Sequence, residues 1–114
     1  MAMTDCIFCK IAAHEIPASI VYEDDKLIAF DDLYPQAPVH VLLIPKEHYQ
    51  DIADSIPDDL LLAMMRAIPE IAKIKGIDET GYRVVTNKGA DAGQTVFHVH
   101  IHIMGGKTLK EEGL

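Results

Sequence analysis

The sequence predicts an α+β fold, in which an antiparallel sheet of about five strands packs against one long and one short helix. Apolar and polar residues alternate from 97 to 103, which indicates a strand because successive side chains leave opposite faces of a sheet. Apolar runs at 27–31 and 39–45 are bounded by turn residues and indicate further strands. Residues 58–76 carry apolar side chains at spacings of three and four, which is typical of an amphipathic helix.

The first part of the chain is expected to form the short helix and a pair of strands. Residues 6 to about 13 predict the helix, and the Asp5 carboxylate can cap its first free amides. The apolar residues on one side of this helix are Ile7, Phe8 and Ile11. Strands are expected at 20–23 and 27–31, because the Asp-Asp-Lys sequence between them suits a turn.

The remainder predicts a central strand at 39–45, the long helix and two more strands. Pro57 suits the start of the helix, where a missing N–H costs nothing, whereas Pro69 should kink the helix or break one hydrogen bond. A strand is expected at 81–87. The loop at 88–93, which contains two glycines, then leads into the alternating stretch.

Composition and charge limit the class of protein. Residues 1–114 are expected to form a single domain, with a core from about 6 to 106 and a polar tail at 107–114. A formal net charge of −8 argues against binding to a nucleic-acid polymer, whose phosphates attract basic surfaces. No apolar run has the length of a membrane span and no signal peptide is evident, so we expect a cytoplasmic protein without membrane contact.

The alternating stretch carries His98, His100 and His102 on one face. The residues on its other face, which suit a core, are Phe97, Val99, Ile101 and Ile103. The histidines could simply form a polar face, or two of them could bind one zinc ion as a His-x-His pair. They could also perform covalent chemistry, because a neutral imidazole is a nucleophile near pH 7 and its neighbour can donate a proton.

The segment 98–104, His-Val-His-Ile-His-Ile-Met, resembles the signature of the histidine triad (HIT) superfamily, in which single apolar residues separate three histidines. His102 stands where the uridylyltransferase branch has glutamine, which is similar to the hydrolase branches. The segment 31–40, Asp-Asp-Leu-Tyr-Pro-Gln-Ala-Pro-Val-His, resembles the Hint branch of purine nucleoside phosphoramidases. The resemblance extends from about 6 to 106. It implies a HIT-like fold whose sheet continues across a homodimer, and an AMP-like purine nucleotide as ligand.

Cys6 and Cys9 are the only cysteines, and a single Cys-x-x-Cys pair indicates zinc or redox chemistry only weakly. Zinc-bearing members of the superfamily combine this pair with the first histidine of the triad and the histidine of an Ile-Pro-Lys-x-His segment. The matching residues here are His98 and His48. The resemblance therefore implies a possible structural zinc on Cys6, Cys9, His48 and His98.

The resemblance also implies which residues bind the nucleotide. Those expected around the base are Phe8, Phe30 and Leu33, although core packing would also explain Phe8. Asp32 is expected to bind the ribose, since the two oxygens of a carboxylate can accept from both hydroxyls. Those expected around the phosphate and leaving group are Asn87, Gly93, Gln94, Thr95 and Val96. Backbone amides of glycine-containing loops can approach a phosphate closely.

By this resemblance, His100 is the nucleophile, which attacks the phosphorus of a nucleoside 5′-phosphoramidate and forms a nucleotidyl-histidine that water then hydrolyses. The unreactive nitrogen of its ring should donate to a backbone carbonyl near His98. His102 should contact the phosphoryl oxygens or the leaving atom, and His40 should lie beside the triad. No catalytic cofactor is required. Two alternatives stay open: a zinc-dependent hydrolase with His98 and His100 as ligands, and a nucleotide-binding regulatory or scaffold protein with little turnover.

Overall fold

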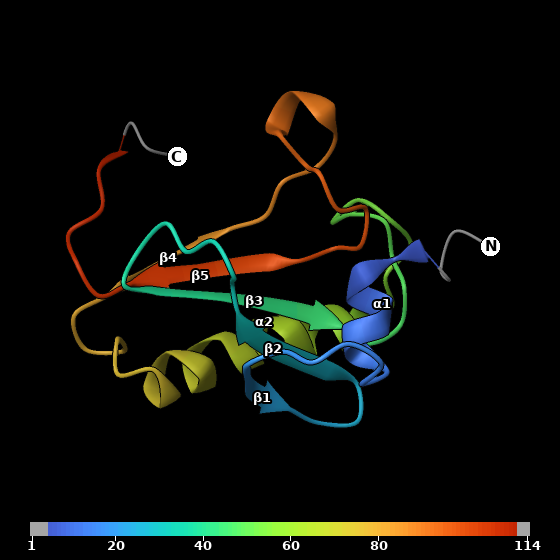
Figure 1. Cartoon of the computed structure of the whole chain (residues 1–114). Coiled ribbons are helices and arrows are strands. Elements are labelled where there is room, and N and C mark those ends of the chain that lie inside the picture. Colours follow the sequence, from blue (N-terminus) through green and yellow to red (C-terminus); the bar gives the residue numbers. More distant parts are fainter. Residues whose placement is uncertain (1–4, 112–114) are drawn as a thin grey trace.

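A computed structural model describes residues 5–111 and contains a five-stranded antiparallel sheet with the strand order β1-β2-β3-β5-β4 (Figure 1). The α+β class and the long helix are thereby confirmed. The bounds of the elements are α1 Ile7–Ala12, β1 Ile20–Glu23, β2 Leu27–Asp31, β3 Val39–Pro45, α2 Asp58–Ile74, β4 Tyr82–Val85, the 3₁₀ turn η2 Ala90–Ala92, and β5 Ile101–Gly105.

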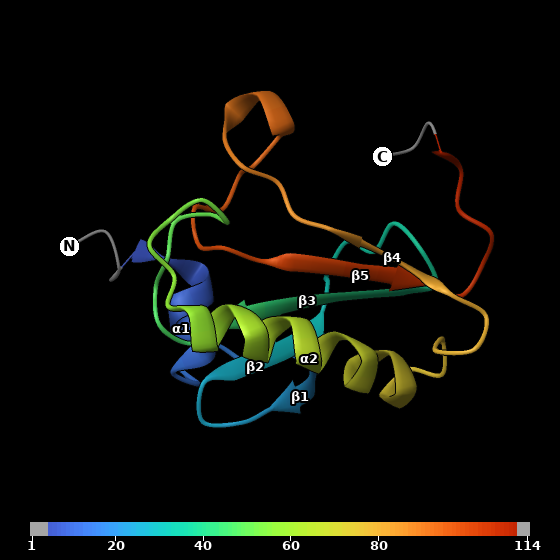
Figure 2. The ribbon, with the colours of Figure 1, turned by 180° about the vertical axis from the view of Figure 1, so that it is seen from behind.

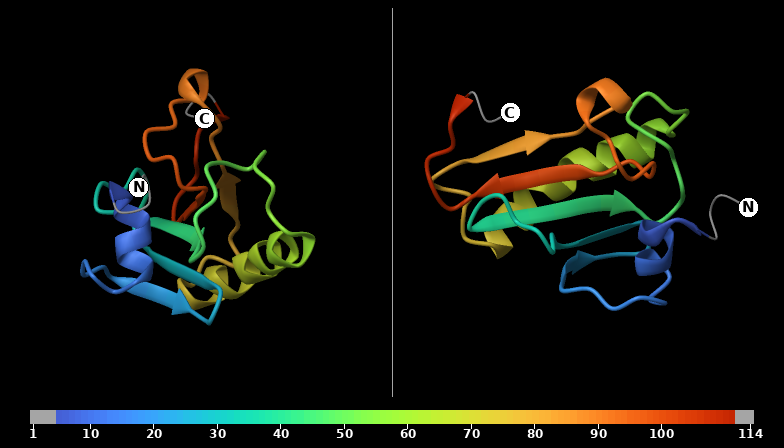
Figure 3. Two further views of the ribbon diagram at one scale, coloured as in Figure 1. Left: turned by 90° about the vertical axis from the view of Figure 1, so that its right-hand side faces the viewer. Right: turned by 45° about the horizontal axis from the view of Figure 1, so that its top comes forward.

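The two helices cover opposite faces of the sheet. Viewed from behind, α2 lies across the strands, and the edge-on view places the sheet between α1 and α2 (Figures 2 and 3). The alternation of side chains in β2 and β3 divides the core accordingly. The α2 side contains Leu27, Ala29, Val41, Leu43, Ile101, Ile103, Met64 and Ile71, among others. The α1 side contains Phe8, Ile11, Ala12, Ile28, Phe30, Leu42 and Ile44.

The long helix begins after Pro57 and continues through Pro69 to Ile74. Asp58 and Asp59 occupy its first turn, where negative charge is favoured by the helix dipole. The helix ends two residues before Gly76, whose φ of 72° lies in the left-handed region that glycine adopts at low cost. Among residues 5–111, no helix is both long enough and apolar enough to cross a membrane.

Two details of α1 differ from the prediction. The N-cap is Cys6, whose sulfur accepts from the backbone amide of Cys9 at 3.3 Å, and Asp5 lies exposed outside the helix. Ile7 is also exposed, whereas Phe8 and Ile11 are buried. A sulfur atom caps this helix because both cysteines turn toward the buried His98 and the half-buried His48, a long-range arrangement that local sequence does not reveal.

The histidine stretch is only partly a strand. β5 begins at Ile101, so His98 and His100 lie in the irregular segment that enters it. The prediction that Phe97 faces the core is wrong, since 48% of this residue is exposed. Val99 is buried as expected, and its amide donates to the Tyr49 carbonyl at a loop rather than to a strand neighbour. Strand pairing here is replaced by contacts with the loop that follows β3.

Candidate active site and metal centre

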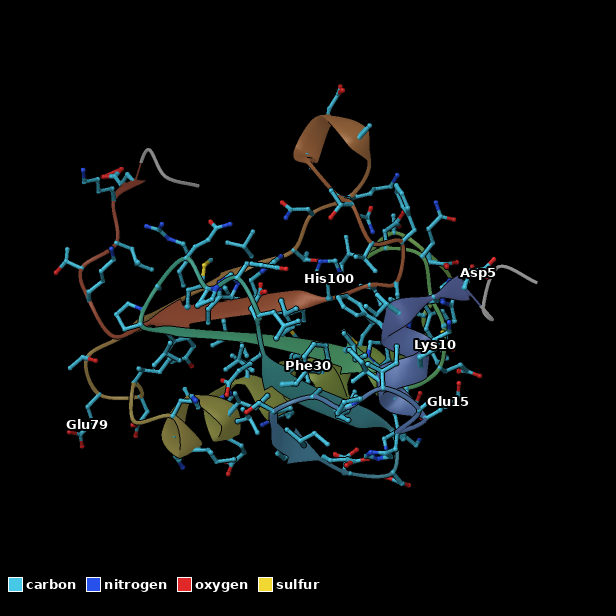
Figure 4. The ribbon with its side chains drawn as sticks, viewed as in Figure 1. Asp5, Lys10, Glu15, Phe30, Glu79 and His100 are labelled. Carbon is cyan, nitrogen blue, oxygen red and sulfur yellow. The ribbon has the colours of Figure 1, made fainter. Side chains whose placement is uncertain are left out.

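The histidines gather on the face of the sheet that α2 leaves uncovered. Figure 4 shows His100 where the chain enters β5, with α1 at one end of the sheet and Phe30 on β2. His98 and His100 are buried, and so is His40 on β3. Each imidazole has hydrogen-bond partners that decide which ring nitrogen carries the proton. These tautomers define what each ring can do.

The His100 ring is held by the backbone of its own segment. Its Nδ1 lies 2.8 Å from the carbonyl oxygen of His98, and because a carbonyl can only accept, Nδ1 carries the proton and donates. This carbonyl is the acceptor expected near His98. The hydroxyl of Thr86 donates to the carbonyl of His100 at 2.8 Å and fixes the segment from the β4 side. Nε2 of His100 therefore carries a lone pair that can act as a base or a nucleophile.

His102 has the opposite tautomer. The backbone amide of Gln36 donates to Nδ1 of His40 at 3.0 Å, so the proton of a neutral His40 is on Nε2. That Nε2–H donates to Nδ1 of His102 at 2.9 Å. His102 consequently carries its own proton on Nε2, where it can donate to a ligand. An oxygen of the Asp32 carboxylate lies 3.4 Å from Nε2 of His40.

Burial favours the neutral form of His40 and His102. It lowers the pKa of His102 to about 4, and the neighbouring His100 and His40 act in the same direction. Burial also lowers the pKa of His40, an effect that the Asp32 carboxylate opposes. Asp32, His40 and His102 could be considered a metal site because their ligand atoms lie within 4.8 Å of one another. The hydrogen bond from the Gln36 amide to Nδ1 of His40 argues against a metal ion at this position. Because Nδ1 accepts, a neutral His40 must carry its proton on Nε2, and a metal ion bound to Nε2 would displace that proton.

Cys6, Cys9, His48 and His98 form a second cluster, whose ligand atoms also lie within 4.8 Å of one another. Nδ1 of His98 is 3.3 Å from the sulfur of Cys6 and 3.5 Å from that of Cys9, and Nδ1 of His48 is 3.2 Å from the sulfur of Cys9. A tetrahedral zinc ion bound by sulfur and nitrogen separates these atoms by about 3.5 Å. Two thiols and two imidazoles are also a common zinc ligand set.

The protonation of this cluster supports the fit to zinc. Nε2 of His98 donates to the carbonyl of Pro45 at 2.8 Å, so the lone pair is on Nδ1 and points to the cysteines. Burial and the neighbouring Cys6 raise the pKa of the Cys9 thiol to about 12, so a thiolate here needs a cationic partner. Among the described residues, the potential metal clusters never combine His98 with His100. The two nitrogens of His98 already contact the Pro45 carbonyl and the cysteines, which disfavours the alternative of a catalytic zinc shared by His98 and His100.

The residues expected around a base and ribose lie near the histidines, with one exception. Phe8 and Phe30 pack edge to face with their centroids 5.6 Å apart, and Phe8 packs likewise on His100 at 5.1 Å. Asp32 follows β2 on the same side, and its Oδ1 accepts from the amide of Tyr34. Leu33 is 85% exposed, so in this structure it does not enclose an apolar pocket.

The loop between β4 and β5 is organised by Gln94, whose buried side chain makes three hydrogen bonds within the protein. Its Oε1 accepts from the amide of Gly89 at 2.8 Å, and its Nε2 donates to the carbonyls of Gln50 and Val96 at 2.9 and 3.2 Å. These contacts hold the loop in place, and direct binding of the nucleotide by Gln94 stays a prediction. Gly89 and Gly93 adopt positive φ angles, which explains the glycines of the loop.

The other residues expected to contact the phosphate line two different cavities. Asn87 lines a cavity of about 460 Å³ together with His40 and His102. Thr95 and Val96 instead line a hollow of about 350 Å³ beside the cysteine cluster. Sequence reasoning missed the backbone contacts of Gln36 and the hydroxyl of Thr86. The only feature of the sequence that could have indicated the role of Thr86 is its position at the end of a predicted strand.

The pKa of His102 predicts how stability depends on pH. In the unfolded chain a histidine titrates near 6.5, so between about pH 4 and 6.5 the unfolded state binds more protons than the folded state. Lowering the pH from about 7 to 5 should therefore reduce the free energy of unfolding by about 2 kcal/mol through His102. Urea denaturation at several pH values measures this slope.

His102→Gln is the matched variant, because its amide oxygen can still accept from His40. We expect a shallower pH dependence for this variant over the same range. Equal slopes in the two proteins, measured under the same metal conditions, would show that His102 titrates normally.

Comparison with known proteins shows which family the chain belongs to. The family model of the HIT domain matches residues 13–109. Protein HitA of Neisseria gonorrhoeae is 52% identical over 105 residues, which are 90% of this chain and 97% of that protein. The structure of a HIT family hydrolase from Clostridium thermocellum is 45% identical with a TM-score of 0.90, covering 96% of this chain and 97% of that chain.

A histidine triad nucleotide-binding protein from Candida albicans has 36% identity and a TM-score of 0.81, with coverage of 93% of this chain and 84% of that chain. The family model spans most of the sequence. The matched residues include the three alternating histidines described above, His98, His100 and His102. This chain therefore belongs to the family defined by the HIT domain.

Proposed function

We propose that the protein is a nucleotide hydrolase that cleaves purine nucleoside 5′-phosphoramidates, or related nucleotide conjugates, to the nucleoside monophosphate. The observation that carries the proposal is the tautomer of His100. Its Nδ1–H is bound to the His98 carbonyl, which leaves a lone pair on Nε2 in a buried ring. The hydrolase and nucleotide-binding names of the similar structures support the same reaction class.

The reaction proceeds in two displacements at phosphorus. Nε2 of His100 attacks, the P–N bond breaks, its electron pair goes to the leaving nitrogen, and this nitrogen takes a proton from solvent. Water then attacks the nucleotidyl-histidine, the P–Nε2 bond breaks, and the electron pair returns to His100 while a proton returns to solvent. The sum is phosphoramidate plus water giving monophosphate plus amine. A covalent intermediate divides one difficult displacement into two easier ones.

His102 and His98 have different tasks in this scheme. The Nε2–H of His102 donates to the phosphoryl oxygens or the leaving nitrogen, where negative charge develops. The chain of amide and imidazole hydrogen bonds through His40 keeps that proton in place. His98 offers its carbonyl to His100 and its side chain to the cysteines. It is a positioning residue rather than the attacking group.

The nucleoside is proposed to lie over β2 and β3. Phe8 and Phe30 offer an apolar wall for a purine, and the Asp32 carboxylate can accept from ribose hydroxyls. Asp32 already accepts from Tyr34 through one oxygen, so the second oxygen beside His40 is the freer one. Leu33 would need to turn inward to cover the base.

Zinc on Cys6, Cys9, His48 and His98 would serve the architecture. When bound, it supplies a cross-link between three distant segments and takes no part in the displacement. The cysteines start α1, which carries Phe8, and His98 precedes the nucleophile by two residues. The cluster thus connects the wall of the base site to the reacting histidine.

A homodimer is proposed to form along β4. This strand is an edge of the sheet, and its Val84 is 44% exposed. An unpaired edge offers free amides and carbonyls to another strand, so a second copy could extend the sheet.

The direct test is to incubate the protein with adenosine 5′-phosphoramidate, with and without a chelator, and to follow AMP release. We expect release to resist brief chelation and acid-quenched protein to carry an added adenylyl mass. A catalytic zinc would instead make turnover depend on the metal without any adduct. AMP binding without turnover would favour a regulatory or scaffold role.

A further inference from the structure

The cavity of about 460 Å³ beside His102 is lined by basic side chains. Asn87 and His102 line its inner end, and the basic residues on its wall are Arg83, Lys107 and Lys110. No Asp or Glu of the described residues is among its lining. This local charge is opposite in sign to the net charge of −8 that the whole chain carries.

The basic residues of this cavity differ from most others in the protein. The chain has ten Lys and Arg residues, all within 5–111. Those paired with a carboxylate in the described structure are Lys26, Lys46, Lys73, Lys75 and Lys88. Arg83, Lys107 and Lys110 are three of the remaining five. Within residues 5–111 these three form no ion pair with a carboxylate, so their charges can attract an anion entering the cavity.

The cavity wall is fixed by the fold. Gly106 turns the chain at the end of β5 with a φ of 91°, and a Cβ there would meet Pro38 at 3.0 Å. The following segment lies at the end of the sheet opposite α1 (Figure 1). Arg83 on β4 donates through Nη1 to the carbonyl of Lys110 at 2.9 Å and holds this segment beside the sheet. Its other guanidinium N–H groups make no bond to residues 5–111.

The position of the cavity relative to the histidines suggests what enters it. The cavity spans from His40 on β3 across β5 to β4, where strand pairing places Arg83 opposite Met104, so its basic wall lies at the β4 end. The proposed nucleoside site extends the other way, over β2 and β3. The phosphorus must lie near His100, between the two. A group attached to phosphorus and directed away from the nucleoside therefore reaches this cavity.

We propose that the cavity is a leaving-group site selective for amines that carry a carboxylate. This rests on the proposed function and adds its substrate class: phosphoramidates of nucleotides with acidic or amino-acid leaving groups. The guanidinium of Arg83 can donate to both carboxylate oxygens, while Lys107 and Lys110 contribute charge. The nucleotide's own phosphate is a poorer candidate for this position, because His100 is not among the residues that line the cavity.

The test compares adenosine 5′-phosphoramidates of β-alanine and β-alaninamide, which have similar sizes but differ in charge. We expect kcat/KM to be about fivefold higher for the carboxylate substrate, since exposed ion pairs contribute modestly. In Lys107→Gln/Lys110→Gln this ratio should fall to about one, with the neutral substrate changed less than about twofold. The ratio in the parent should also decrease at high salt.

Lys73→Gln, on the surface of α2, is the matched control and should keep the parent ratio. Equal rates for both substrates in the parent, or a preference that survives in the double variant, would overturn the proposal. If the parent protein hydrolyses neither compound, the affinity of the His100→Ala variant for each compound is measured by calorimetry instead. Tighter binding of the carboxylate compound, lost with Lys107 and Lys110, would then support the site although the proposed hydrolase had failed.

Discussion

Replacing His100 by alanine is expected to lower kcat for AMP release by at least about 10⁴-fold, because the variant lacks the atom that forms the bond to phosphorus. The fold should survive. Loss of the hydrogen bond to the His98 carbonyl leaves one buried acceptor unpaired, at a cost of about 1–3 kcal/mol. Steady-state kinetics and urea denaturation of the same preparation measure the two effects separately.

His14→Ala is the matched control, because His14 is an exposed histidine paired with Glu23. Its turnover should equal that of the parent. Release of AMP by a folded His100→Ala protein at the parent rate would contradict the assignment of the nucleophile. Trapping of the adenylyl adduct on another residue would identify that residue as the nucleophile in place of His100.

Removing zinc from the site proposed on Cys6, Cys9, His48 and His98 is expected to lower the free energy of unfolding by several kcal/mol, because a structural metal joins segments that the unfolded chain separates. Cys9→Ser should have a comparable effect, since it removes the sulfur that contacts both His48 and His98. Thermal unfolding of the parent and the variant, each with zinc and with chelator, measures both.

The parent and Cys9→Ser, each measured with zinc and with chelator, form a thermodynamic cycle. The chelator should destabilise the parent strongly and Cys9→Ser little, because the variant has already lost the site. Purified parent protein should contain about one zinc per chain. A parent without metal and insensitive to chelator would show that the cluster is only a set of packed thiols and imidazoles.

Much of the sheet could be predicted from the sequence. The bounds predicted for β1, β2 and β3 agree with the structure, because their short apolar runs are delimited by turn residues. The Asp24 carboxylate, for example, accepts from the amides of Lys26 and Leu27 and closes the turn before β2. Such signals act within a few residues of one another.

The start of β5 could not be predicted in this way. Alternation from 97 to 103 is the pattern of a strand, yet β5 begins at Ile101. Val99 bonds to Tyr49 instead of a neighbouring strand, and Phe97 lies outside the core. The Val99 bond depends on a loop some 50 residues earlier in the chain. The pattern of alternating residues does not contain that information.

For the site, the signature identified the histidines, whereas their partners required the fold. The bond between His40 and His102 joins residues 62 positions apart, and Gln36 contributes through its backbone amide, which every residue type except proline carries. The roles proposed for the nucleotide contacts remain predictions. The basic cavity was likewise not visible beforehand, because its wall combines β4 with the segment after Gly106.

The three imidazoles of the triad face three different chemical neighbours, and main-chain atoms decide the protonation of each. Exchanging the side chains of the cavity wall at 107–110 should therefore leave the protonation of the triad unchanged. The wall formed by 107–110 follows β5 and is held to the sheet by the bond from Arg83 to the Lys110 carbonyl, which is a main-chain atom that any replacement sequence keeps. For protein engineering, this separates the reaction from its selectivity: new leaving groups could be addressed by grafting this short segment alone.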